Sequence, residues 1–212
     1  LDFFETVFIP HSTLKWLFQE KQKASFHQPS RIKDAHQIQR FLSMGILEKL
    51  VPNIVPDSDL AAQVGDELAL LLAEAKRANE NNNTQCIVVK PYPVPRISSF
   101  MDEVADLSEY EDLLSSCQAI VDKILSKGQI TVEEEKKISS YFLIQEKPWP
   151  KQPEIKDKAT LYLDDLAMTY FLHLGLLEKI KTAGFRIIVS PSELAEVNEL
   201  TFYENTSDQI KG

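Results

Sequence analysis

Three short apolar segments, each followed directly by polar residues or a proline, most restrict the folds that this chain can adopt. They are QCIVVKP (85–91), the run at 160–163 and RIIVS (186–190), with helix-like segments between them. Runs of four or five aliphatic and β-branched residues are typical of buried strands. Strands that alternate with helices form parallel sheets whose faces are covered by the helices. The sequence therefore predicts an α/β fold built on a parallel sheet.

Helical periodicity and capping residues place the remaining elements. A Thr-x-x-Glu capping box opens the segment that starts at Thr131. Two further strands are expected at 6–9 and, interrupted by a proline, at 51–55. The Pro-rich run 147–158 reads as a linker, in which Trp149 is expected to pin the linker onto a domain. Helices are expected at 30–50, 56–60 leading into 66–78, 108–128, 131–144, 166–182 and 192–203.

These elements divide the chain into two blocks with a segment between them. Residues 1–95 form a first α/β block, 96–155 a helical segment with the Pro-rich linker, and 156–212 a second β-α-β-α block. ETVFIPHSTLKWL (5–17) aligns with RIIVSPSELAEVN (186–198), which suggests an internal duplication. The chain does not begin with Met, so we expect it to be a piece of a longer protein or a processed product.

Charge and cysteine content narrow the class of protein. The formal net charge is −9, which argues against binding nucleic acid through a broad basic surface that neutralises its phosphates. Cys86 and Cys117 show no metal-ligand spacing and are expected to be two reduced thiols in a cytoplasmic protein. No stretch is apolar enough for a membrane span, so no membrane partner is expected.

The second block resembles the opening of a PIN domain, the metal-dependent nuclease fold of toxin ribonucleases and RNA-processing factors. LYLDDLAMTYF (161–171) is similar to the first PIN strand, which ends in an acid and leads into a helix. GFRIIVSPSELAEVNEL (184–200) is similar to the second strand, its proline and the helix that carries the second acid. The order is also similar to large bacterial proteins with two PIN-like modules in tandem. The resemblance implies three-layer α/β/α blocks and leaves 96–155 outside.

The resemblance also implies a set of carboxylates. Asp164, with Asp165 beside it, takes the first acidic position, and Glu196 takes the second, with Glu193 as an alternative. The first block resembles the later part of another PIN-like domain, in which Asp66 begins the helix that carries the third acid.

The first block departs from the family pattern. Lys15 stands where the alignment on the prolines puts the second acid, and Lys90 follows QCIVV where the family has an aspartate. The first strand of that block is not present, and two acids of the second block would lie beyond Gly212. The first block therefore resembles a degenerate PIN-like domain.

Carboxylates at the carboxyl edge of a parallel sheet suit Mg²⁺ or Mn²⁺, which prefer oxygen ligands and can activate water for phosphodiester hydrolysis. Plainer roles stay open. Asp164 or Asp165 can cap the helix that follows, Glu196 can be an exposed helical glutamate, and Asp66 can favour a helix dipole. If 156–212 packs against 1–95, in a permuted arrangement or a swapped dimer, the acids could instead form one composite site.

The leading expectation is a PIN-like, divalent-metal-dependent nuclease that hydrolyses RNA and shows little activity as this isolated chain. Asp164 and Glu196 would be its catalytic acids, with Asp165 and Asp66 as further metal ligands. The alternative is a non-catalytic, degenerate PIN-like scaffold that binds a protein or nucleic-acid partner, which the net charge and the two lysines favour. A helical regulatory module fused to an unrelated effector domain would fit if 96–155 were the main partner surface.

Overall fold

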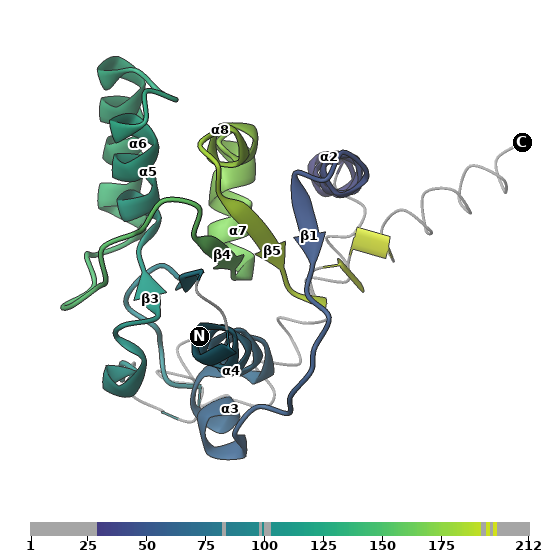
Figure 1. Ribbon diagram of the computed structural model, residues 1–212, viewed down its shortest axis with the longest axis vertical. Helices are drawn as coiled ribbons and strands as arrows, with labels where there is room; N and C mark the ends of the chain where they lie inside the picture. The colour runs from purple at the N-terminus through teal and green to yellow at the C-terminus, as the bar shows by residue number, and fades with distance from the viewer. Residues whose placement is uncertain are drawn as a thin grey trace, which may run out of the picture.

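The computed structural model describes residues 29–81, 84–97, 99, 103–191, 194, 195, 197 and 198, with side chains from Lys33 onward. Within these residues, five strands form one sheet in which all neighbouring strands run parallel. The spatial order is β1-β5-β4-β2-β3 (Figure 1). The strands are β1 (Leu47–Lys49), β2 (Cys86–Val89), β3 (Leu114–Ser115), β4 (Thr160–Leu163) and β5 (Arg186–Val189). The predicted α/β fold with a parallel sheet is confirmed.

Helices cover both faces of this sheet (Figure 1). The described helices are α2 (Pro29–Ser43), α3 (Ser58–Val64), α4 (Asp66–Asn81), the 3₁₀ turn η1 (Ser108–Tyr110), α5 (Cys117–Ser126), α6 (Val132–Gln145), α7 (Asp165–His173) and α8 (Leu177–Thr182). Because successive strand residues point to opposite faces, β4 separates two cores. Leu161 and Leu163 pack with α2, α5, α6, α7 and α8, whereas Tyr162 packs with α3 and α4. The three-layer α/β/α arrangement expected from the sequence is present.

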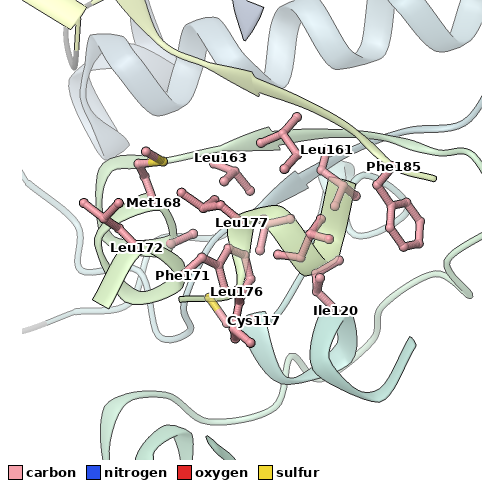
Figure 2. Packing of buried hydrophobic residues seen from close by; sticks show 14 of the residues in the cluster. Cys117, Ile120, Leu161, Leu163, Met168, Phe171, Leu172, Leu176, Leu177 and Phe185 are labelled. Carbon is pink, nitrogen blue, oxygen red and sulfur yellow. The ribbon is translucent and has the colours of Figure 1, made fainter. Parts of the chain in front are cut away.

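The larger core is built from aliphatic and aromatic side chains of the α5–α8 layer. Figure 2 shows Phe171 and Leu176 close to Cys117 and Ile120, beneath Leu161 and Leu163. Phe171 is fully buried, and its ring meets that of Phe142 edge-on at 6.4 Å between centroids. Both cysteines are buried free thiols, as expected.

Several local predictions are confirmed. Strand 160–163 has the expected bounds, and the capping box of Thr131 and Glu134 is formed at the start of α6. The Trp149 ring lies 4.8 Å from that of Tyr92, and its Nε1 donates to the carbonyl oxygen of Lys90 at 2.8 Å. Trp149 therefore fixes the Pro-rich run to the end of β2.

Other local predictions are wrong at helix boundaries. The helix expected over 30–50 ends at Ser43, because Gly45 takes a left-handed conformation (φ 67°) and the buried Leu47 then enters the sheet as β1. Residues 51–55 form no strand. The helix expected over 108–128 is divided, since Leu114 is buried beside Val88 in strand pairing. The helix over 166–182 is likewise broken at Gly175 (φ 65°).

One sheet draws its strands from all three ranges into which the sequence divides. β4 pairs with β2, and β5 pairs with β1, so 156–212 packs against 1–95, as the composite-site hypothesis requires. The strand expected at 6–9 lies outside the described residues, as do Lys15 and most of the helix at 192–203. No described helix is long and apolar enough to cross a membrane.

Candidate functional site

The neighbouring strands β2 and β4 form a topological switch point, because the connections that leave them run to opposite edges of the sheet. The connection that leaves β2 leads outward to β3, with Ala105 and Leu107 in the α3–α4 core. The connection that leaves β4 leads the other way to β5 through α7 and α8, on the opposite face. Such a switch point opens a crevice at the carboxyl ends of the two strands, the usual ligand site of open α/β sheets. We take this edge of the sheet as the candidate site.

Lys90 and Asp164 are the first residues after the two strands and meet across this switch point. The Lys90 ammonium donates a hydrogen bond to Asp164 Oδ2 and lies 3.8 Å from Asp165 Oδ1. The Asp164 side chain is 2% exposed and that of Lys90 is 13% exposed. The pair is therefore a buried salt bridge that joins the two halves of the sheet.

Asp164 also caps α7. Its Oδ1 accepts a hydrogen bond from the Ala167 backbone N–H at 2.9 Å, and its backbone is extended, as an N-cap requires. The two oxygens of this carboxylate thus have separate tasks, one on the helix and one on Lys90. The capping role that the sequence left open for Asp164 is present.

Burial dominates the electrostatics of the pair. It raises the pKa of Asp164 to about 7, while the Lys90 ammonium acts in the opposite direction. Burial by itself would lower the pKa of Lys90, but the carboxylates of Asp164, Asp165 and Glu67 outweigh it and raise that pKa. Lys90 is therefore held as a cation, with three carboxylates around it.

Two further polar contacts flank the pair. On the α4 side, the Ser190 hydroxyl, at the end of β5, donates to Glu67 Oε1. On the α5 side, the buried Glu146 accepts the N–H groups of Cys117 and Gln118 at 3.1 and 2.8 Å. Burial raises the pKa of Glu146 despite these two hydrogen bonds. Glu146 thus occupies the start of α5, where helix N–H groups would otherwise face solvent or an anion.

The structure brings only some of the predicted site residues together. Asp164 lies at the centre of the site, and Asp165 is exposed beside it, with its Oδ1 also accepting from the Leu166 N–H at 2.8 Å. Asp66 is an exposed residue in the first turn of α4. Glu196 and its alternative Glu193 lie outside the described residues, so the composite site of Asp66, Asp164 and Glu196 stays a prediction.

Sequence reasoning missed Glu67, Ser190 and Glu146. Ser190 directly follows the apolar residues of β5, as Lys90 and Asp164 follow those of β2 and β4, and that position was an available signal. Glu67 and Glu146 carried no local signal in the sequence. The role of Glu67 depends on the packing of α4 against the end of β5, and that of Glu146 on the packing of the end of α6 against the start of α5.

The donor set around Asp164 does not fit a divalent ion as it is placed. Asp164 Oδ2 is bound to an ammonium group, and a metal ion at that oxygen would face a like charge in a poorly solvated position. Within the part of the chain that the structure describes, no three His, Cys, Asp or Glu side chains are grouped so as to hold a metal ion. Lys90 is thus the cation that Asp164 binds in this structure.

Comparisons with protein-family models, with curated proteins and with solved structures each give no match. The resemblance to PIN domains therefore rests on the sequence motifs alone.

Substitutions at Asp164 should separate its two tasks. Asn is as good an N-cap as Asp but carries no charge, so Asp164→Asn should lower the free energy of unfolding by about 1.5–3 kcal/mol, the range for hydrogen bonds to charged groups. Asp164→Ala loses the cap as well and should cost about 1 kcal/mol more. Urea denaturation of the two variants measures the difference. Equal losses would show that the contact with Ala167 does not stabilise α7.

Proposed function

We propose that this chain is a non-catalytic PIN-like module that acts as a binding scaffold for a protein partner. The observation that carries the proposal is the buried Lys90–Asp164 pair at the switch point of the sheet. The family part of the proposal is supported by the LYLDDLAMTYF and RIIVSPSELAEV motifs.

The chemistry of the pair favours a structural role. Buried carboxylates need a counter-charge, and in metal-dependent nucleases a divalent ion supplies it. Here the cation is the ammonium group of Lys90. Lys90 directly follows QCIVV, at the position where the PIN-like pattern has an aspartate. A lysine ammonium neutralises Asp164, but unlike a divalent ion it cannot coordinate a water molecule and lower its pKa. The site can therefore stabilise the fold without binding a metal.

The overall charge favours a protein partner over a nucleic acid. A net charge of −9 repels phosphate, and a protein that grips nucleic acid by its backbone needs clustered Lys and Arg. At the switch point, Lys90 pairs with Asp164 and lies near Asp165, and the charge of Glu67 also acts on it, so its positive charge is already offset.

Metal dependence of stability and of RNA cleavage tests this proposal. A divalent ion bound at 100 times its dissociation constant would stabilise the folded state by about 2.7 kcal/mol. We expect no such gain: the Tm in millimolar MgCl₂ or MnCl₂ should equal the Tm in NaCl of the same ionic strength. Labelled single-stranded RNA should stay intact under conditions in which an established metal nuclease cleaves it. A metal-dependent rise in Tm that Asp164→Asn removes would contradict the proposal.

Metal-dependent hydrolysis of RNA is the second candidate function. The position of Asp164 at the carboxyl end of β4, with Asp165 beside it, favours this candidate. It requires the Lys90 ammonium to leave Asp164 and further acids to join, Glu196 among them. RNA cleavage in Mn²⁺ that is lost in Asp164→Asn and in Glu196→Gln, with folding retained, would support this second candidate.

A further inference from the structure

A groove is lined by residues of α3, α4 and η1, and neither Lys90 nor Asp164 is among its lining residues. It consists of two adjoining hollows of about 290 and 360 Å³ that share Asp57, Leu60 and Tyr110 as lining residues. The N-terminal part of α3 forms one wall, α4 forms a second, and η1 forms the third. Leu60 and Tyr110 thus give a partly apolar centre common to both hollows.

Negative charge dominates the rim of this groove. Asp59, Asp106 and Glu109 are exposed around one hollow, and Glu80 is exposed at the other. A backbone N–H of Ser108 bonds to Asp106 and lowers the pKa of that carboxyl, which therefore stays ionised at neutral pH.

Two basic side chains, Lys76 and Arg77, also line the groove, and they differ in how much of the negative charge at the rim they neutralise. Arg77 donates two hydrogen bonds, at 3.0 and 2.8 Å, to the buried Glu74, which neutralises its charge. The Lys76 ammonium lies over the ring of Tyr110, 5.8 Å from its centroid. The groove therefore keeps a negative balance, and its central aromatic ring already accepts a lysine ammonium.

We propose that this groove binds a basic peptide segment of another protein. Charge complementarity identifies this occupant: Lys and Arg heads would meet Asp59 and Glu109 at the rim. The long apolar stems of Lys and Arg would lie on Leu60 and Tyr110. The Lys76 ammonium already lies over the Tyr110 ring, so the cationic heads of the peptide would bind the rim carboxylates and not the ring. A phosphate-bearing partner would be repelled by the same rim.

This inference does not depend on the Lys90–Asp164 pair being inert. The groove and the pair use different residues, so metal binding at Asp164 would leave the peptide experiment unaffected. Absence of peptide binding would, in turn, leave the metal experiment unaffected.

Fluorescence anisotropy with a labelled, extended peptide rich in Arg and Lys tests the proposal. The wild-type chain should give saturable binding that weakens as salt rises, and an acidic peptide of equal length should not bind. The double variant Asp59→Asn/Glu109→Gln should weaken binding at least tenfold. Glu133→Gln/Glu178→Gln removes two exposed acids from α6 and α8, and should change the dissociation constant by less than twofold.

A second variant separates the groove from general charge attraction. Tyr110→Ala keeps the net charge but removes the aromatic surface, so it should also weaken binding severalfold while Asp59 and Glu109 remain. Equal losses in the two double variants, or wild-type affinity in Tyr110→Ala, would overturn the proposal. Absence of saturable binding by the wild-type chain would overturn it as well.

Discussion

Replacing Lys90 with Met should lower the free energy of unfolding by about 3–5 kcal/mol, the usual cost of removing one partner from a buried salt bridge. Methionine keeps most of the length of the lysine stem, so the loss would come from the charge. Asp164 would be left buried, and the pKa of its carboxyl would rise further, because the ammonium that opposes the effect of burial is gone. Urea denaturation followed by circular dichroism measures this loss.

Lys136→Met is the matched control for this substitution. Lys136 is an exposed residue of α6, and its replacement should change stability by no more than about 0.5 kcal/mol. If Lys90→Met were as stable as Lys136→Met, Lys90 would not be the counter-ion of a buried carboxylate.

Replacing Phe171 with Ala should also cost about 3–5 kcal/mol, because a large cavity would open in the closely packed α5–α8 layer (Figure 2). The lost side chain also makes the edge-on contact with Phe142. In a domain of this size each kcal/mol corresponds to about 2–4 °C in Tm, so Tm should fall by roughly 6–20 °C. Differential scanning calorimetry measures this fall.

Leu143→Ala provides the comparison within the same layer. Leu143 is 82% exposed near the end of α6, and Ala is the better helix former, so stability should change by no more than about 0.5 kcal/mol. A loss at Leu143 as large as that at Phe171 would mean that Leu143 is covered in solution, by another part of the chain or by a second copy.

Strong local signals made much of the fold predictable. β4 and β5 are apolar runs bounded by polar residues, and α6 opens with a capping box, so each could be located from its own residues. β1 and β3 could not be located in this way. Each has two or three residues, and β3 forms because Leu114 fits beside Val88 in the sheet. Such short strands form because of contacts between segments that are distant in the chain, and no local sequence pattern indicates those contacts.

The candidate site was predictable in its position and less so in its composition. A charged residue directly after an apolar strand indicates the carboxyl edge of a parallel sheet, and Asp164 and Lys90 both carry that signal. Their pairing depends on β2 and β4 being neighbours, although about seventy residues separate them in the chain. Strand order comes from the whole set of crossovers, which the sequence pattern left open.

A double-mutant cycle at Lys90 and Asp164 tests the structural role of the pair most directly. It requires the free energies of unfolding of the wild-type chain, Lys90→Met, Asp164→Asn and the double variant, all in the same buffer. If the two side chains neutralise each other, the loss in the double variant should be smaller than the sum of the two single losses, by a coupling free energy of about 2–3 kcal/mol. A coupling below about 0.5 kcal/mol would show that the two charges do not stabilise each other, and would contradict the structural role proposed for Lys90.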